Sequence, residues 1–300
     1  MVAKLHYEAD MAQVEIARKI GVSTASVSRL LQKARTLGIV KIEVLDLVSL
    51  EEMTIELIDA LGLKRAAVIE APSVGVLGAL AAPVDALIKD EGFQSGSVMG
   101  IGWGRAVREV LVAGLSPVPG VRAVALNGGM QQSAPHFQIN EFVRQAAEQF
   151  GGSAHFLHAP YLSSSELRGA FLSEPSMRET IALWERLDCA LVGVGLPHFS
   201  SEAKDATRPE QGIEGAVGDV IRHYFDFNGT VLPWEGEQRM LAVSVDQLRR
   251  TKLSIGLAVA MEKARAIIGA VRSGLINALV TDRSTAQAIL DILRPEPSDT

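Results

Sequence analysis

From about Lys64 onward, short and nearly continuous apolar runs alternate with segments of helical periodicity such as Ala106–Ala113 and Met261–Ser273. Parallel strands that are buried on both faces have this kind of apolar run, because helices cover both sides of such a sheet. The alternation predicts an α/β domain with a mainly parallel sheet. The expected strands are RAAVIE (65–70), GSVMGI (96–101), VRAVALN (121–127), SAHFLHAP (153–160), CALVGVG (189–195) and NALVTD (277–282).

Three of these runs end in turns that contain glycine: GIGWGR (100–105), NGGM (127–130) and VGVGLPH (192–198). Ligands of open α/β sheets bind outside the carboxyl ends of the strands, and the first turn leads into a helix whose N-terminus can hold an anion. A single turn of this kind is explained equally well by a tight turn without a ligand, but three together favour a pocket. The candidate pocket residues are Gly102, Gly104, Arg105, Asn127, Gly128, Gly129 and Gly195.

A further stretch, GAVGDVIRHYFDFNG (215–229), combines glycines with Asp219, Arg222, Asp226 and Asn228. Carboxylate and amide groups beside a glycine turn suit the hydroxyls of a sugar or polyol, and the alternative is a turn with solvated acids.

Several other chemistries lack their sequence patterns. Arg105 stands where a dinucleotide fingerprint needs its third glycine, and there is no G-K-[ST], H-E-x-x-H or G-x-S-x-G pattern, so no cofactor and no metal are expected. The one cysteine, Cys189, lies in an apolar run and is interpreted as a buried, inert thiol. No apolar run approaches the roughly 18 residues of a membrane span, and the first ten residues lack the apolar stretch of a signal peptide. We therefore expect a cytoplasmic protein without membrane contact.

The N-terminal segment EIARKIGVSTASVSRLL (15–31) predicts a helix-turn-helix. Ile16 and Ile20 share one face of a first helix. A second apolar stripe consists of Val27, Leu30, Leu31 and Ala34. Gly21 lies between these two helical segments, where a sharp turn needs positive φ. The alternative is an ordinary helical hairpin with a solvated polar face. Ser23 to Val40 contains no acidic residue, so this face can approach phosphates without repulsion.

The second helix of such a motif enters the major groove of double-stranded DNA. Arg29 is the candidate for reading guanine, and the hydroxyl residues suit bases or phosphates. The candidate DNA-binding residues are Gln13, Ser23, Thr24, Ser26, Ser28, Arg29 and Lys33.

The charge distribution agrees with a nucleic-acid-binding head on a separate body. Residues 1–45 carry a net charge of +3, although the whole chain carries −6. The pattern of Leu37–Asp46 predicts a strand. Ser49 and Glu52 form a capping box, which predicts a helix that begins there and ends at about Leu61. The expected layout is a DNA-binding domain at 1–50, an effector and oligomerisation domain at 51–294, and a disordered tail at 295–300.

These motifs together resemble the SorC family of sugar-responsive bacterial transcriptional regulators, over nearly the whole chain. The helix-turn-helix segment, GAVGDVIRHYFDFNG and KARAIIGAVRSGLINALVTDRSTA (263–286) carry most of the resemblance. It implies a Rossmann-like effector domain similar to phosphosugar isomerases and deaminases, dimers or tetramers, and a pocket that includes Asp226 and Lys263 beside the glycine turns. It also implies a first helix longer than the segment before His6, so we expect a short first helix or a true start upstream.

Two departures from the family pattern bear on the effector. Gly102 and Ala106 stand where the family usually has a serine and a threonine, which leaves a phosphorylated and an unphosphorylated effector about equally plausible. Asn127 stands in a turn without a lysine, so we expect reversible binding rather than a Schiff base. The leading interpretation is a regulator of a carbohydrate operon, repressor or activator, and not an enzyme; the alternative is a phosphosugar isomerase or deaminase with an accessory DNA module.

Overall fold

The structure is a computed structural model that describes residues 1–7, 9, 11–40, 49–129, 138–197 and 213–294. The chain divides into two compact units, Met1–Val48 and Ser49–Thr300. The tail predicted at 295–300 and most of the strand predicted at Leu37–Asp46 lie outside the described residues, and residues 37–40 form turns rather than a strand.

The small unit has three helices, α1 (Val2–Tyr7), α2 (Gln13–Ile20) and α3 (Thr24–Thr36). Gly21 ends α2 with a φ of 73°, and the Ser23 hydroxyl caps α3 by accepting the backbone N–H of Ser26. The predicted helix-turn-helix is therefore confirmed as a structure. Its small core consists of Ile16, Ala17, Val27 and Leu31.

Leu30 departs from the predicted apolar stripe, because 46% of it is exposed. Val27 and Leu31 are four positions apart and face the first two helices, whereas Leu30 lies beside them at the edge of the core.

The larger unit is built on a seven-stranded sheet in the order β1-β10-β9-β5-β2-β3-β4, in which every neighbouring pair is parallel. The predicted parallel α/β fold is thus confirmed. The strands are β1 (Arg65–Ile69), β2 (Val98–Ile101), β3 (Arg122–Ala125), β4 (Ser153–His155), β5 (Cys189–Gly193), β9 (Leu253–Leu257) and β10 (Ala278–Asp282).

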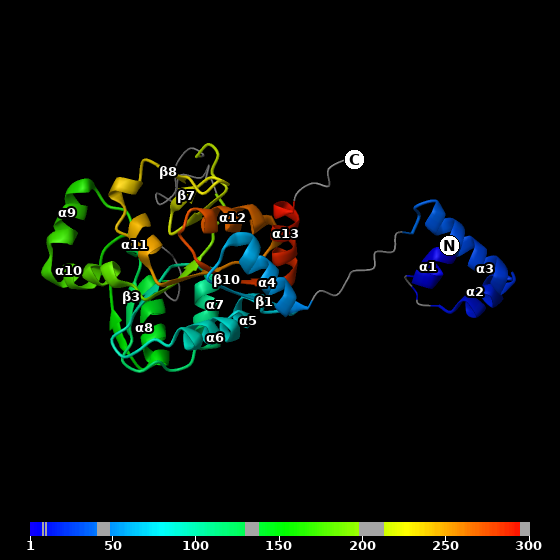
Figure 1. Cartoon of the computed structure of the whole chain (residues 1–300), viewed down its shortest axis with the longest axis horizontal. Coiled ribbons are helices and arrows are strands. Elements are labelled where there is room, and N and C mark those ends of the chain that lie inside the picture. Colours follow the sequence, from blue (N-terminus) through cyan, green and yellow to red (C-terminus); the bar gives the residue numbers. More distant parts are fainter. Residues whose placement is uncertain (8, 10, 41–48, 130–137, 198–212, 295–300) are drawn as a thin grey trace. The chain divides into compact units, whose positions relative to one another are not determined.

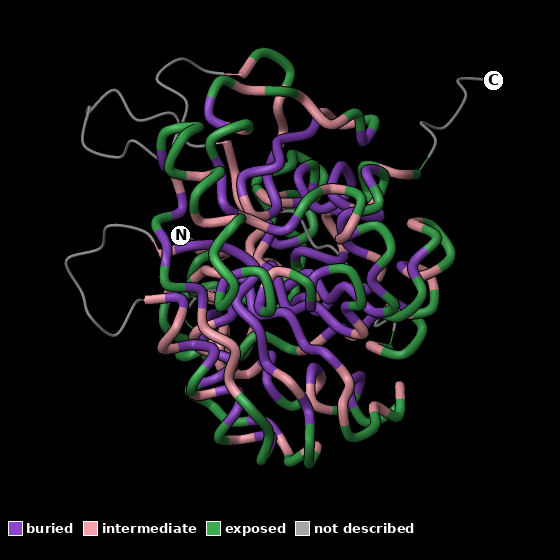
Figure 2. Tube along the Cα trace, turned by 90° about the vertical axis from the view of Figure 1, so that its left-hand side faces the viewer, coloured by how far each residue is buried: buried purple, intermediate pink, exposed green. Residues whose placement is uncertain are grey.

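Helices cover both faces of this sheet (Figure 1). The chain advances from β2 to β3 in one direction along the sheet and from β9 to β10 in the other, so right-handed crossovers put their helices on opposite faces. One face carries α5 (Val76–Ala79), α6 (Ala81–Glu91), α7 (Arg105–Ala113) and α8 (Ile139–Phe150), and the other carries α4 (Leu50–Leu61), α12 (Ala264–Arg272) and α13 (Arg283–Leu293). The buried residues concentrate along the strands and the inner faces of these helices (Figure 2).

Two features of this unit were not predicted from the sequence. Strand β9 was missed because Ser254 and Gly256 interrupt its apolar run. The segment at 215–232 forms a small antiparallel sheet of β6 (Gly218–Val220), β7 (His223–Phe225) and β8 (Val231–Leu232). This sheet lies close against α12, since a Cβ on Gly218 would come within 2.7 Å of the Cβ of Ala266.

The remaining helical elements follow β4, β8 and β9. They are α9 (Ser165–Ser173), α10 (Pro175–Ala182) and α11 (Val245–Arg250), with 3₁₀ turns at Leu183–Arg186, Glu237–Arg239 and Met261–Lys263. Helix α10 continues directly as the 3₁₀ turn at Leu183–Arg186. No described helix is long and apolar enough to cross a membrane.

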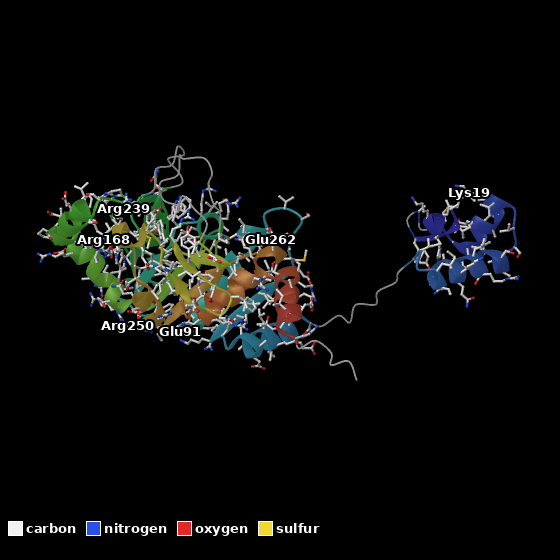
Figure 3. The ribbon with its side chains drawn as sticks, turned by 90° about the horizontal axis from the view of Figure 1, so that it is seen from above. Lys19, Glu91, Arg168, Arg239, Arg250 and Glu262 are labelled. Atoms are coloured by element: carbon white, nitrogen blue, oxygen red, sulfur yellow. The ribbon has the colours of Figure 1, made fainter. Side chains whose placement is uncertain are left out.

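Charged side chains cover the outside of both units (Figure 3). Glu91 at the end of α6 accepts a hydrogen bond from Lys64 at 2.8 Å and lies 3.2 Å from Lys252. The hydrogen bond from Lys64 holds the pKa of the Glu91 carboxyl below its usual range. This cluster ties together the starts of β1 and β9, at the opposite end of the sheet from the cavity described next.

Candidate functional sites

The first candidate site is the exposed side of α3 in the small unit. Ala25, Ser28, Arg29 and Gln32 follow one another at helical spacing and are all exposed. Arg29 makes one weak intrahelical contact, from its Nε to the carbonyl of Ala25 at 3.4 Å, so its guanidinium is available for other partners. Gln32 belongs to this side and was missed in the sequence, although its spacing from Ser28 could have shown it.

The predicted DNA-binding residues divide into two groups by their contacts. Ser23 and Ser26 hydrogen-bond each other and cap α3, which orients the start of the helix. Thr24 and Lys33 are exposed, and Gln13 is the half-buried first residue of α2. The helix-turn-helix therefore presents hydroxyl and basic groups outward, over a core that contains none of them.

The second candidate site is a cavity of about 670 Å³ at the carboxyl ends of the strands of the larger unit. It lies where β2 and β5 are neighbours, the position at which the chain changes direction along the sheet. Such a topological switch point is the usual ligand crevice of an open α/β sheet, and the volume is in the range of small-molecule sites. The loops after β2, β3, β5 and β9 all contribute to its wall.

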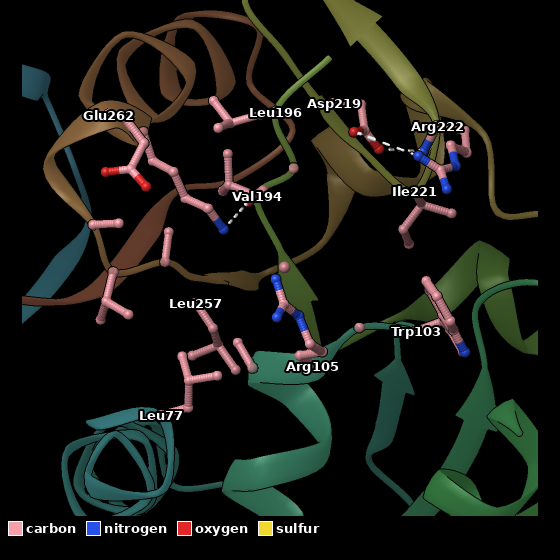
Figure 4. A pocket seen from close by; sticks show the side chains of 18 of the residues that line it. Leu77, Trp103, Arg105, Val194, Leu196, Asp219, Ile221, Arg222, Leu257 and Glu262 are labelled. Atoms are coloured by element: carbon pink, nitrogen blue, oxygen red, sulfur yellow. Dashed lines mark hydrogen bonds and ion pairs between the residues drawn. The ribbon is translucent and has the colours of Figure 1, made fainter. Parts of the chain in front are cut away.

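Five of the predicted effector residues line this cavity. Gly104 and Arg105 come from the loop after β2, Asn127 from the loop after β3, Gly195 from the loop after β5, and Lys263 from the 3₁₀ turn before α12. Apolar side chains including Leu77, Leu196 and Leu257 complete the wall (Figure 4).

Three of the predicted glycines do not line the cavity, because their backbone groups are used within the fold. The N–H of Gly102 donates to the carbonyl of Leu191, and the N–H groups of Gly128 and Gly129 donate to the carbonyls of Leu241 and Ala159. Gly102 and Gly128 also make a close approach of two segments possible. A Cβ on Gly128, for example, would lie 2.6 Å from the carbonyl oxygen of Pro160.

Asp226 also lies apart from the residues that line the cavity. Its carboxylate accepts the backbone N–H groups of Asn228 and Thr230 in the turn between β7 and β8. These hydrogen bonds, first that from Thr230, hold the pKa of Asp226 below its usual range. Asp226 therefore organises a turn, and the prediction that it faces a ligand is not supported by its position.

The buried carboxylate that lines the cavity is Asp219, seven residues earlier, and the exposed Glu262 lines it as well. Asp219 is buried beside Gly195, and its Oδ2 accepts the backbone N–H of Arg222 at 3.0 Å. The Arg222 guanidinium lies 3.9 Å from Oδ1, and Figure 4 shows both side chains at one end of the cavity. A Cβ at position 195 would come within 2.3 Å of Oδ1, so only glycine there leaves room for this carboxylate.

A cationic end is formed by Arg105 and Lys263. Arg105 rises from the start of α7 toward Val194 (Figure 4) and makes no hydrogen bond or ion pair with the described residues. Lys263 donates from its Nζ to the carbonyl of Val194 at 2.9 Å. Burial lowers the pKa of Lys263, and the neighbouring charge of Arg105 lowers it further. No side chain caps the N-terminus of α7, so its first N–H groups add partial positive charge here.

Asn127 brings an acceptor into the cavity wall. Its side-chain amide donates to the carbonyl of Gly128, and its Oδ1 is buried without a partner among the described residues. A buried acceptor without a partner is costly, and a hydroxyl group of a ligand would satisfy it. The cavity thus combines positive charge with groups that bind hydroxyls. No cluster of metal-ligating side chains occurs in the described part of the chain.

Comparison with known proteins finds relatives that match nearly the whole chain. The sugar-binding domain family Sugar-bind matches residues 44–291. The sorbitol operon regulator of Klebsiella pneumoniae is 30% identical over 96% of both chains, and the deoxyribonucleoside regulator of Bacillus subtilis is 27% identical over 97% of this chain and 96% of its own. The crystal structure of the full-length Klebsiella pneumoniae regulator superposes with a TM-score of 0.71 at 30% identity, covering 98% of this chain and 97% of that one.

Proposed function

The chain belongs to the SorC family of sugar-responsive transcriptional regulators, and on that premise we propose that α3 binds operator DNA and that the cavity binds an anionic sugar derivative. The proposal for the DNA site rests on the exposed Ser28, Arg29 and Gln32 of α3. We further propose that the protein works as a homodimer or homotetramer in the cytoplasm, because paired half-sites of an operator require paired heads.

The observation that carries the effector class is the cationic end of the cavity. Arg105 has no carboxylate partner among the described residues, and the pKa of Lys263 is lowered first by burial and then by the charge of Arg105. Two cations that repel each other beside an uncapped helix N-terminus are stabilised when an anion binds between them. A phosphorylated sugar or polyol supplies the anion, and its hydroxyls suit Asn127 and Asp219.

We propose binding without turnover. Asp219 is the buried carboxylate of the cavity, and its oxygens accept the Arg222 N–H and face the Arg222 guanidinium. A carboxylate held in this way is suited to accept hydrogen bonds from hydroxyls rather than to abstract a proton.

The effector proposal is tested by thermal stability against matched pairs of ligands, each pair being one sugar or polyol with and without phosphate. Sorbitol with sorbitol 6-phosphate is the first pair, because a sorbitol operon regulator is similar to this chain over 96% of both chains. A ligand at 100 times its dissociation constant adds about 2.7 kcal/mol of stability. We expect only phosphorylated members to raise the melting temperature, and Arg105→Gln to abolish the difference within a pair. Stabilisation by free polyols alone would contradict an anionic effector.

The DNA proposal is tested with two variants of α3. Arg29→Ala should cost about 1–3 kcal/mol of operator affinity and relax the base preference at one position. Lys33→Ala should weaken binding to all sequences alike and reduce the salt dependence. If Arg29→Ala weakens binding to operator and to random DNA by the same factor, as Lys33→Ala should, then Arg29 is not the residue that reads a base.

A further inference from the structure

Backbone strain in the larger unit is concentrated in the wall of the cavity. Among the described residues, only three that are not glycine have positive φ: Ile221, Arg222 and Ala260. All three line the cavity, from two unrelated loops. Strained backbone persists only where surrounding contacts hold it, and it gathers at ligand sites.

Ala260 is the most unusual of the three, with φ 113° and ψ 129°. Both of its backbone polar groups are fixed by hydrogen bonds. Its N–H donates to the Thr285 hydroxyl oxygen at 2.8 Å, and its carbonyl accepts the N–H of Lys263 at 3.0 Å. Ala260 therefore connects the start of α13 to the turn that carries Lys263.

Thr285 is itself held in place. It is completely buried, and its hydroxyl donates to Oδ1 of Asp282, so its oxygen is oriented to accept the N–H of Ala260. Oδ2 of Asp282 accepts a hydrogen bond from the Ser284 hydroxyl at 2.6 Å. The chain of hydrogen bonds thus runs from Asp282 through Thr285 and Ala260 to Lys263.

We infer that Thr285 is a positioning residue of the effector site: its hydroxyl fixes the strained turn at Ala260 and thereby places the Lys263 ammonium in the cavity. This inference rests on the proposed function, because it gives Thr285 a role in binding the anion. Thr285 does not line the cavity, and it acts through the backbone of Ala260.

The test uses two substitutions in the full-length chain. Thr285→Val keeps the shape of the side chain and removes the hydroxyl, whereas Thr285→Ser keeps the hydroxyl and removes the methyl group. We expect affinity for sorbitol 6-phosphate, measured by calorimetry, to fall about tenfold in Thr285→Val, the size of one lost hydrogen bond, and to be restored in Thr285→Ser. Equal losses in both variants would show a packing role and overturn the inference.

A second measurement needs no effector. The pH dependence of Lys263 acetylation, followed by mass spectrometry, reports how far this amine is held in its buried position. Burial lowers the pKa of Lys263, so Thr285→Val should move the midpoint of its profile up toward the ordinary range of a lysine, and Thr285→Ser should leave it unchanged. An unchanged midpoint in Thr285→Val would overturn the inference.

The two measurements separate the inference from the proposed function. If wild-type protein binds neither sorbitol 6-phosphate nor any other ester of the matched pairs, the proposed effector class is wrong, and the acetylation profile still decides whether Thr285 positions Lys263. If wild-type protein binds an ester and Thr285→Val binds it equally well, the effector class stands and the positioning role is wrong.

Discussion

Replacement of Ala260 by glycine should make the protein more stable. At φ 113° the Cβ of alanine is strained, and a residue held in such a region costs of the order of 1–3 kcal/mol. Glycine removes this strain but loses more chain entropy on folding, which costs about 0.5–1 kcal/mol. The net expectation is a gain of about 0–2.5 kcal/mol, whereas an ordinary alanine-to-glycine change is a loss.

The matched control is Ala258→Gly, two residues earlier in the same loop. Ala258 also lines the cavity, is fully buried and is not among the residues with positive φ. Its substitution by glycine should cost about 1–2 kcal/mol, from chain entropy and the lost burial of a methyl group.

Urea unfolding of the wild type and both variants measures these changes, with the transition of the larger unit followed by tryptophan fluorescence. The midpoint should rise for Ala260→Gly and fall for Ala258→Gly. Equal losses in the two variants would refute the assignment of strain to Ala260. The same Ala260→Gly variant should bind its effector less tightly, because a relaxed turn no longer holds the site in its binding geometry.

Three further predictions concern the cavity. Because burial lowers the pKa of Lys263, affinity for a phosphorylated ligand, measured by calorimetry, should fall as pH rises through that pKa, at a lower pH than for an ordinary lysine. Lys263→Arg should move the fall to higher pH. Gly195→Ala would place a Cβ 2.3 Å from Oδ1 of Asp219 and should cost about 1–3 kcal/mol in urea unfolding, whereas Gly193→Ala meets no atom within 4 Å and should be nearly neutral. Ala106→Thr would place at the start of α7 the hydroxyl that the family usually has there. This change should raise affinity for a phosphate ester about tenfold or more and leave affinity for the free polyol unchanged. An equal gain in affinity for both ligands would exclude a contact between this hydroxyl and the phosphate.

The sequence predicted the parts of the site that follow from parallel topology. Carboxyl ends of parallel strands meet at one edge of the sheet, so turns after three predicted strands placed Arg105, Asn127 and Gly195 together without knowledge of the strand order. The strand order could not be predicted, because the sequence pattern did not identify β9 as a strand. Strand β9 lies between β5 and β10 in the sheet.

The choice between Asp219 and Asp226 shows where sequence reasoning stopped. Both are acidic residues near glycines in one stretch, and no periodicity distinguishes them. The two-residue turn at Ile221–Arg222 determines which of the two faces the cavity, because it pairs β6 with β7 in antiparallel. Asp219 then lies beside Gly195, whereas Asp226 lies in the turn between β7 and β8. A turn with positive φ at an isoleucine is disfavoured locally, so tertiary contacts, among them the hydrogen bond from the Tyr161 hydroxyl to the carbonyl of Ile221, select it.

The strained turn at Ala260 also suggests how an effector reaches the rest of the larger unit. Ala260 is bonded to Thr285 near the start of α13, and the other end of α13 is tied to α4 by the ion pair between Arg294 and Glu56. Helix α4 begins at Leu50, directly after the unit that contains the helix-turn-helix. An effector shifts the balance between two states only by the difference in its affinity for them. The turn at Ala260 supplies a difference in effector affinity between two states. In a state in which Ala260 relaxes, Lys263 is no longer held in the cavity, and the anion binds less tightly.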